Sequence, residues 1–356
     1  MSDRYAIDSH KLHLHPARVA AWLEGGNIAP VYIEVSPSGA CNHRCRFCAL
    51  DFMGYKPRFL PVDPFCERLR EMGAAGVRSI MYAGEGEPFL HRDMAKIAQK
   101  TKEAGIDVAF TTNGVLLRGD TARAILPVTS WIKVSCNAGS SETYARIHRT
   151  RPDDFGTMLR RLAEALEERE RLGSSCVIGF QMILLPDNMA ETISLANTVR
   201  DLGADYFVVK PYSQHPQSLT SEYAEVSYAD CMEIAEELES LSTESFAGIF
   251  RRQAMQRWQN REKAYSRCLA MPFWSYVDAR GEVWGCSMFL NDPRFAYGNI
   301  LERSFDEIWS GEQRKQSLAW CSRSLNAAEC RINCRMDAIN HYLHALRNPD
   351  PYANFI

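Results

Sequence analysis

The sequence lacks long hydrophobic runs and has no excess of one charge. No stretch approaches the roughly 18 consecutive apolar residues of a transmembrane helix, and the polar residues 1–26 have no secretory apolar core. Lys and Arg number 41 against 44 Asp and Glu, so the net charge of −3 gives no basic surplus for binding a phosphate backbone. Internal repeats and low-complexity segments are absent. We therefore expect a folded cytoplasmic protein that binds neither a membrane nor a nucleic acid.

Cysteine is plentiful, with 12 in 356 residues. Cytosolic thiols stay reduced, so such clusters usually bind metal or perform chemistry rather than form disulfides. One group is Cys41, Cys45 and Cys48, and a second is Cys268, Cys286, Cys321, Cys330 and Cys334. The others, Cys66, Cys136, Cys176 and Cys231, stand alone in apolar segments. We expect these four to be small buried side chains without chemistry.

Six short segments rich in β-branched and aromatic residues predict buried strands. They lie at residues 31–36, 78–84, 107–114, 130–137, 175–185 and 205–213. The intervening segments have helical periodicity, as in the apolar stripe of Phe155, Met158, Leu159, Leu162 and Leu166. Helices between strands imply parallel pairing, hence an α/β sheet or an open barrel. Such folds place their sites in the loops that follow the strands.

The pattern changes after the sixth predicted strand. Residues 223–266 are charged and helical, which is typical of a connector. A second domain is expected over residues 267–356, and it opens with FWSYVDARGEVWGC, a β-hairpin whose Gly281 can adopt a positive φ. We therefore divide the chain into an extension (1–30), an α/β domain (31–222), the connector and this C-terminal domain.

The first cysteine group can direct three thiolates at one centre. Four thiolates would close a tetrahedral zinc or iron–sulfur site, whereas three leave one coordination position free. A zinc site would need a fourth ligand, and His43 is the only imidazole in this loop. The spacing of Cys41, Cys45 and Cys48 allows either metal centre and favours the iron–sulfur one.

Two motifs resemble the radical S-adenosylmethionine (radical SAM) superfamily. They are Cys-x-x-x-Cys-x-Phe-Cys after the first predicted strand and Gly-Glu-Gly-Glu-Pro at residues 84–88 after the second. The resemblance implies a [4Fe–4S] cluster on Cys41, Cys45 and Cys48, with S-adenosylmethionine chelating the remaining iron. Reduction then cleaves S-adenosylmethionine to a 5′-deoxyadenosyl radical that abstracts a substrate hydrogen. The implied fold is a partial (β/α) barrel of six parallel strands with a small C-terminal β-hairpin plus helix domain.

The resemblance also implies a set of residues that bind the cofactor. They are Phe47, Gly84, Glu85, Gly86, Glu87, Pro88, Thr112, Asn113, Ser135, Asn137 and Gln181. Glu87 would supply negative charge near the methionine ammonium, and the glycines would let the backbone approach it. For Phe47 the alternative role is loop packing. Strand-end capping is the alternative for Thr112, Asn113, Ser135, Asn137 and Gln181. No catalytic residue is identified, and Tyr82, Lys210 and Tyr212 are candidates at the rim for contact with substrate.

The second cysteine group resembles the SPASM/Twitch extension of this superfamily. The resemblance implies one auxiliary [4Fe–4S] cluster on Cys268, Cys286, Cys330 and Cys334, with Cys321 as a buried thiol or a substitute ligand. A second auxiliary cluster is not expected, because Ser324 stands at one family cysteine position and no cysteine follows Cys334. A zinc site that braces the small domain is the alternative for this quartet.

An auxiliary cluster whose irons are all bound by cysteine can transfer electrons but cannot act as a Lewis acid toward the substrate. The resemblance to Twitch-type relatives, some of which dehydrogenate aminocyclitol or sugar-like alcohols, implies dehydrogenation of a small polar substrate, such as a sugar, aminocyclitol or nucleoside alcohol, with the auxiliary cluster accepting an electron. A flavodoxin or ferredoxin would be the reducing partner. The alternative is a peptide-modifying maturase that forms a crosslink or thioether or oxidises a residue, although only about thirty residues precede the first strand for peptide binding. A non-catalytic or RNA-directed metalloprotein fits less well, since the chain lacks a basic stripe.

Overall fold

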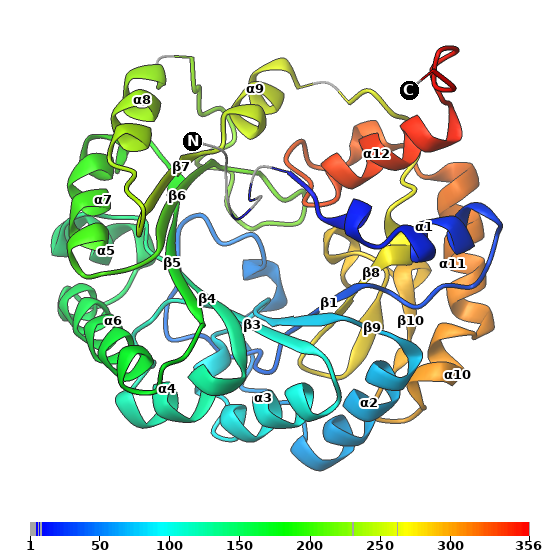
Figure 1. The fold of residues 1–356 in the computed structure, drawn as a ribbon, viewed down its shortest axis with the longest axis horizontal. Helices are drawn as coiled ribbons and strands as arrows, with labels where there is room; N and C mark the ends of the chain where they lie inside the picture. Colours follow the sequence, from blue (N-terminus) through cyan, green and yellow to red (C-terminus); the bar gives the residue numbers. More distant parts are fainter. Residues whose placement is uncertain (1–4, 6, 8, 230, 262, 356) are drawn as a thin grey trace.

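The computed structural model describes residues 5, 7, 9–229, 231–261 and 263–355. These residues form a ten-stranded sheet in the order β10-β9-β8-β1-β2-β3-β4-β5-β6-β7, with helices along its outer side (Figure 1). The strands are β1 (Tyr32–Val35), β2 (Ser79–Tyr82), β3 (Asp107–Thr112), β4 (Thr129–Ser135), β5 (Val177–Leu184), β6 (Tyr206–Pro211), β7 (Ala247–Phe250), β8 (Trp274–Val277), β9 (Glu282–Trp284) and β10 (Ala296–Asn299). The helices are α1 (Pro16–Leu23), α2 (Val62–Ala75), α3 (Met94–Glu103), α4 (Gly119–Ile125), α5 (Ser141–His148), α6 (Asp153–Arg171), α7 (Thr192–Asp201), α8 (Met232–Ser240), α9 (Arg252–Asn260), α10 (Phe305–Trp309), α11 (Glu312–Ser324) and α12 (Asp337–Arg347).

The first six strands coincide with the six predicted segments. Each pairs in parallel with the next, which confirms the partial barrel. Side chains alternate between the two faces of a strand. In β4, Ile132 and Val134 are fully buried, whereas Trp131, Lys133 and Ser135 line cavities inside the curve of the sheet. The inner face thus carries the polar side chains available for chemistry.

The sheet extends beyond the six predicted strands. The segment 223–266, expected to be helical throughout, contains β7 between α8 and α9, and β7 pairs in parallel with β6. That part of the expectation is wrong, because β7 has only four residues and the long helical pattern on either side dominates the local sequence signal. The domain boundaries themselves stay predictions.

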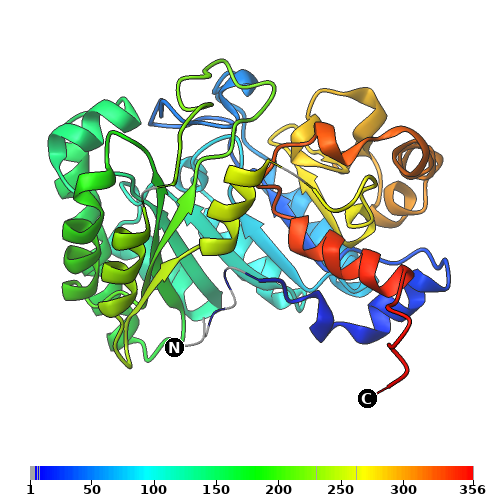
Figure 2. The same ribbon diagram turned by 90° about the horizontal axis from the view of Figure 1, so that it is seen from above.

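The C-terminal domain continues the sheet of the barrel. Strand β8 pairs in parallel with β1, and β9 and β10 follow in antiparallel pairing. The predicted hairpin is confirmed at β8 and β9, where Gly281 has φ +84° and an added Cβ would lie 2.6 Å from Leu301 Cγ. Figure 2 shows the C-terminal elements, yellow to red, beside the open side of the barrel and next to α1. The two halves therefore share one sheet.

The helices pack as their apolar stripes predict. In α6, Phe155, Met158, Leu162 and Leu166 are buried and Leu159 is half-buried, while the charged residues other than Asp154 are half-buried or exposed. None of the helices in the described part of the chain combines the length and the apolar content needed to cross a membrane.

A buried polar joint connects the two halves next to the ends of β1 and β2. Ser36 Oγ lies 2.6 Å from the Tyr276 hydroxyl and accepts a hydrogen bond from the Glu85 backbone N–H at 3.0 Å. Gly84 has φ +100°, and an added Cβ would overlap both Ser36 Oγ and the Tyr276 hydroxyl. Only glycine fits this position, which brings the loop after β2 against β1 and β8.

We expect Tyr276→Phe to lower the free energy of unfolding by ~1 kcal/mol, because a buried hydrogen bond to Ser36 is lost. Urea denaturation of the anaerobically purified protein, followed by circular dichroism, measures this change. Tyr352→Phe, at an exposed position, is the matched control. If both variants unfold at the same urea concentration as the parent, the hydrogen bond between Tyr276 and Ser36 contributes nothing to the free energy of unfolding.

Candidate functional site

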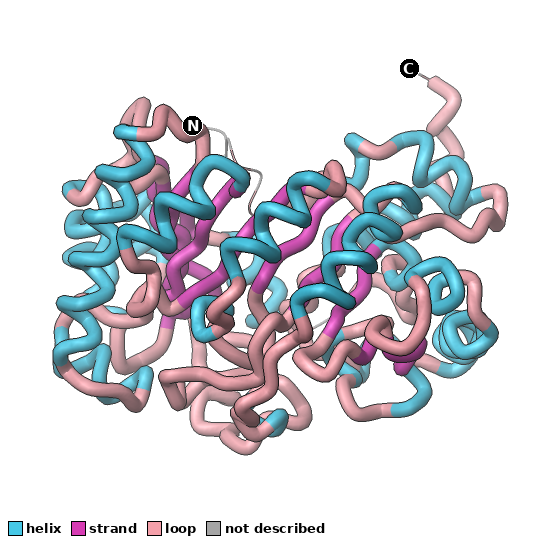
Figure 3. The backbone as a smooth tube through the Cα atoms, turned by 90° about the horizontal axis from the view of Figure 1, so that it is seen from below, coloured by secondary structure: helices cyan, strands magenta, loops and turns pink. Residues whose placement is uncertain are grey.

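A cavity of about 300 Å³ opens at the carboxyl ends of the barrel strands. Loops gather at this end of the strands (Figure 3). Its lining includes the Cys41–Cys48 loop, residues of the loop after β2, polar side chains from β3 to β6, and one residue of the C-terminal domain. The lining residues are Glu34, Cys41, His43, Cys45, Phe47, Cys48, Ala49, Leu50, Met81, Ala83, Gly84, Gly86, Glu87, Thr111, Thr112, Asn113, Lys133, Ser135, His148, Gln181, Ile183, Lys210 and Arg335.

The three thiols predicted as metal ligands lie together on this cavity. Burial, together with the nearby Glu87 carboxylate and Cys48, raises the pKa of Cys41 to about 12. Burial also raises the pKa of Cys45 well above its usual value, with contributions from Cys48 and Cys41. Three half-buried thiols with raised pKa values are poised to bind a cation that stabilises their thiolates.

The spacing of the sulfurs distinguishes between the two metal centres left open by the sequence. Ligands of one tetrahedral zinc ion lie about 3.8 Å apart, given Zn–S bonds of about 2.3 Å. Across the described residues, neither cysteine group brings three sulfurs within 4.8 Å of one another. The wider spacing suits thiolates arranged around a multi-iron cluster.

A buried imidazole faces one of the thiols. His148 Nδ1 lies 3.3 Å from Cys45 Sγ, and His148 Nε2 accepts a hydrogen bond from the Asn137 backbone N–H at 3.2 Å. Burial holds the pKa of His148 well below its usual value, so the ring is neutral. Because Nε2 is an acceptor, the ring proton is on Nδ1 and points at the sulfur. His43, Cys45 and His148 place ligand atoms within 4.8 Å of one another, but the proton on Nδ1 leaves His148 with no lone pair facing the thiol.

The loop after β2 forms the part of the cavity wall beside Cys41. Glu87 accepts hydrogen bonds from the Thr112 hydroxyl at 2.7 Å and the Asn113 backbone N–H at 2.8 Å. Burial raises the pKa of Glu87 to about 7, although these hydrogen bonds oppose the shift. An added Cβ at Gly86 would overlap the backbone oxygens of Ser38 and Ala40. The glycine is thus required for close packing against the residues that lead into the cysteine loop.

Most of the predicted cofactor-binding residues line the cavity, and three do not. Phe47, Gly84, Gly86, Glu87, Thr112, Asn113, Ser135 and Gln181 line it. Glu85 instead accepts a hydrogen bond from the Ala279 N–H at 2.7 Å, so it anchors the β8–β9 hairpin. Asn137 accepts from the Ile183 N–H at 2.6 Å and is buried behind the lining. Pro88 begins a short 3-10 helix and is also buried outside the lining.

Of the three rim candidates, only Lys210 faces the cavity. Tyr82 is fully buried, and its hydroxyl is hydrogen-bonded to Thr101 on α3. Tyr212 is buried, and its hydroxyl donates to Gln214 at 2.8 Å. The expectation that Tyr82 and Tyr212 lie at the rim is therefore wrong. Both side chains are packed in the protein away from the cavity lining.

Several residues of the cavity lining were not predicted from the sequence. Lys133 precedes the predicted Ser135 by two positions in β4, so strand alternation could have found it. Arg335, directly after Cys334, forms an ion pair with Glu34 of β1 and donates to the Tyr32 hydroxyl at 2.9 Å. This contact brings the end of the second cysteine group onto the cavity, and nothing in the local sequence around Arg335 indicates it.

The second cysteine group assembles in the C-terminal domain. Cys268, Cys286, Cys330 and Cys334 are half-buried. Burial raises the pKa of Cys286 well above its usual value, with contributions from Cys334, Cys268 and Cys330. Cys321 on α11 is buried; burial raises its pKa to about 12, with Cys268 and Cys330 contributing. Because Cys321 lies near Cys268 and Cys330, it can be either a buried thiol or a substitute ligand, the two roles that the sequence left open.

The four solitary cysteines are buried as expected: Cys66, Cys136, Cys176 and Cys231.

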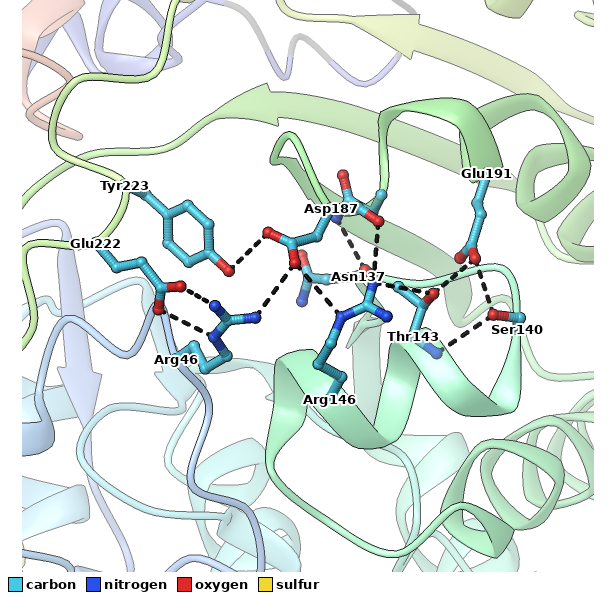
Figure 4. Close-up of polar contacts among 10 residues, drawn as sticks. Arg46, Asn137, Ser140, Thr143, Arg146, Asp187, Glu191, Glu222 and Tyr223 are labelled. Atoms are coloured by element: carbon cyan, nitrogen blue, oxygen red, sulfur yellow. Dashed lines mark hydrogen bonds and ion pairs between the residues drawn. The ribbon is translucent and has the colours of Figure 1, made fainter.

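A polar network holds the first cysteine loop in place (Figure 4). Arg46, within that loop, forms ion pairs with Glu222 and with Asp187, the latter at 3.2 Å. Asp187 also accepts from the Tyr223 hydroxyl at 3.1 Å and lies 3.4 Å from Arg146 of α5. The loop has little regular secondary structure of its own, so these contacts from neighbouring loops fix its position.

Two family models match the chain. Residues 35–199 match the radical SAM superfamily, and residues 268–335 match an iron–sulfur cluster-binding domain, SPASM. Together they imply a cluster that binds S-adenosylmethionine and an auxiliary cluster.

Curated relatives match over part of their length. The chain is 32% identical over 114 residues to an S-adenosylmethionine-dependent nucleotide dehydratase of Lacinutrix mariniflava, which is 31% of this chain and 24% of that protein. It is 42% identical over 92 residues to a GTP 3′,8-cyclase of Stenotrophomonas maltophilia, which is 24% of this chain and 27% of that protein. The chain thus spans about a quarter of each of these relatives.

Solved structures share the fold. Streptococcus suis SuiB bound to its precursor peptide SuiA superposes with a TM-score of 0.63 at 19% identity, covering 84% of this chain and 69% of that one. The anSMEcpe structure with bound AdoMet has a TM-score of 0.56 at 13% identity, covering 92% of this chain and 100% of that one. At these identities the likeness establishes the architecture.

We expect Cys45→Ala to lower the iron content from about eight to about four irons per chain after anaerobic reconstitution, because one of two clusters loses a ligand. Metal analysis and visible absorption measure the loss. Cys66→Ala, which removes a buried thiol outside both groups, should keep all the iron. One or two zinc ions and no iron in the parent would contradict the assignment.

We expect His148→Ala to make the reduction potential of the first cluster more negative by about 40 mV. This is the one-electron equivalent of the ~1 kcal/mol that a hydrogen bond to the Cys45 sulfur contributes. Redox titration monitored by electron paramagnetic resonance measures the potential. His148→Gln keeps an N–H donor and should retain most of it. An unchanged potential in His148→Ala means that the imidazole only fills space.

Proposed function

The chain belongs to the radical SAM superfamily and carries an SPASM-type auxiliary cluster domain, and we propose that it dehydrogenates a small polar substrate. A sugar, aminocyclitol or nucleoside alcohol is the proposed substrate type. A flavodoxin or ferredoxin is the proposed electron donor.

One observation carries this proposal. The cavity that holds Cys41, Cys45 and Cys48 is also lined by Arg335, the residue after Cys334. A substrate in this cavity would therefore lie between the first thiol group and the loop that contributes to the second. The cavity volume of about 300 Å³ is at the lower end of the range for small-molecule pockets.

The residues present fit the groups that the family implies. Cys41, Cys45 and Cys48 would hold the first cluster and leave one iron open, and Cys268, Cys286, Cys330 and Cys334 would hold the auxiliary cluster. When bound, these cofactors supply a radical that removes the hydrogen atom from the substrate carbon and an acceptor for the second electron, while the hydroxyl proton leaves to a base. The carbon–hydrogen and oxygen–hydrogen bonds are thereby replaced by a carbonyl.

Residues of the chain itself would bind and orient S-adenosylmethionine. Glu87 presents a carboxylate to the cavity, held by the Thr112 hydroxyl and the Asn113 N–H. Its negative charge would attract the ammonium group of S-adenosylmethionine. Ser135 and Gln181 line the cavity from β4 and β5 and offer hydrogen bonds to the rest of the cofactor.

We expect Cys268→Ala to separate the two halves of the reaction. With substrate present, 5′-deoxyadenosine should still form, whereas dehydrogenated product should fall at least tenfold because the acceptor for the second electron is lost. Chromatography with mass detection measures both products, and Cys66→Ala is the control. Normal product yield in Cys268→Ala would contradict electron acceptance by the auxiliary cluster.

The substrate itself can be found by measuring consumption of S-adenosylmethionine in an anaerobic screen of polar metabolites and of peptides. Stimulation by a sugar, cyclitol or nucleoside supports the proposal. Stimulation confined to peptides would replace it with peptide modification.

A further inference from the structure

The interior of the barrel continues below the cavity just described. A second cavity of about 420 Å³ lies toward the other end of the strands, and Lys133 and Gln181 line both. Its walls include Trp131, Tyr206 and Val208 of the inner strand faces and Tyr5 of the N-terminal extension. The two spaces therefore meet at the middle of β4 and β5.

Among the residues that the structure describes, the charged side chains of the lower cavity all have the same sign. Every charged side chain among the described residues that line the lower cavity is basic, namely Lys11, Lys133 and Arg251. In the upper cavity Lys210 of β6 adds a further amine. Of the described residues that line the upper cavity, Glu34 and Glu87 are the carboxylates. Glu34 is paired with Arg335, and Glu87 accepts from the Thr112 hydroxyl and the Asn113 N–H.

The two lysines have no carboxylate of their own. Neither Lys133 nor Lys210 forms an ion pair with any residue that the structure describes. Lys133 Nζ lies 5.4 Å from the centre of the Trp131 ring, a contact that does not neutralise its charge. Both lysines are half-buried, and an amine that is partly withdrawn from water without a counterion is stabilised by a ligand of opposite charge.

The electrostatic surroundings agree with this geometry. Burial, together with the nearby Arg251, lowers the pKa of Lys133 to about 8. Burial lowers the pKa of Lys210 well below its usual value, and Lys133, Arg251 and Arg331 add repulsion. Cations that repel one another across a cavity would be relieved by a shared anion.

We propose that Lys133 on β4 and Lys210 on β6 bind an anionic group of the substrate, a carboxylate or a phosphate, in the interior of the barrel. The inference rests on the proposed function and deepens it. Among the proposed substrates it favours an acidic sugar or a nucleotide. It disfavours an aminocyclitol, whose ammonium group would meet like charge.

The test is binding without turnover. Calorimetry on the reconstituted holoprotein, saturated with S-adenosylmethionine, would measure the affinity for pyrophosphate, for glucuronate and for neutral glucose. We expect either anion to bind at least tenfold more tightly than glucose. The stronger of the two identifies phosphate or carboxylate as the recognised group.

Variants assign the binding to the two amines. Lys133→Met and Lys210→Met should each weaken anion binding about tenfold, whereas Lys133→Arg should retain it. Lys96→Met removes an exposed lysine paired with Asp63 and should change nothing. Iron content and circular dichroism, unchanged from the parent, establish that the variants fold.

Three results would overturn the assignment. They are equal affinity for glucose and the anions, anion binding that survives both lysine substitutions, or a loss of S-adenosylmethionine affinity in place of a loss of anion affinity. The last would assign the lysines to the methionine carboxylate. Because no step of this test requires product, failure of the dehydrogenation proposal would appear separately, as anion binding without oxidation.

Discussion

The parallel pairing of β8 with β1 is the constraint on which the rest of the structure depends. It joins the C-terminal domain to the barrel through backbone hydrogen bonds and brings Tyr276 to Ser36 and the Ala279 N–H to Glu85. The loop after β2 is therefore fixed from both sides. Buried polar groups cost more when left unpaired than they contribute when paired, so the two halves of the chain hold one another at the cavity.

The fold was largely predictable, because buried parallel strands and amphipathic helices leave clear patterns. The face that each strand residue occupies was less predictable. Both faces of a parallel strand can be apolar, so periodicity alone does not say which set points inward. Tyr82 was placed on the wrong side for this reason, since its neighbours Met81 and Ala83 face the interior.

The candidate site was predictable where a motif carries it and not where distant segments meet. The Cys41–Cys48 loop and Glu87 were found from their spacing. The alternation within residues 84–88 sends Glu85 toward the hairpin and Glu87 toward the cavity, and the motif does not distinguish them. A net charge of −3 for the whole chain also concealed a basic interior, because composition averages over surface and lumen.

The ion pair between Arg335 and Glu34 would connect metal binding at the C-terminal cysteines to the shape of the cavity at the carboxyl ends of the strands. Glu34 is only 4% exposed, and its partner directly follows Cys334 in the chain. A chain that has not yet received metal on its C-terminal thiols has less to hold that loop. Withdrawal of Arg335 would then leave a buried carboxylate without its counterion, at an energetic cost. Binding of metal by the proposed ligand Cys334 would hold the neighbouring Arg335 beside Glu34 and so complete this part of the cavity wall.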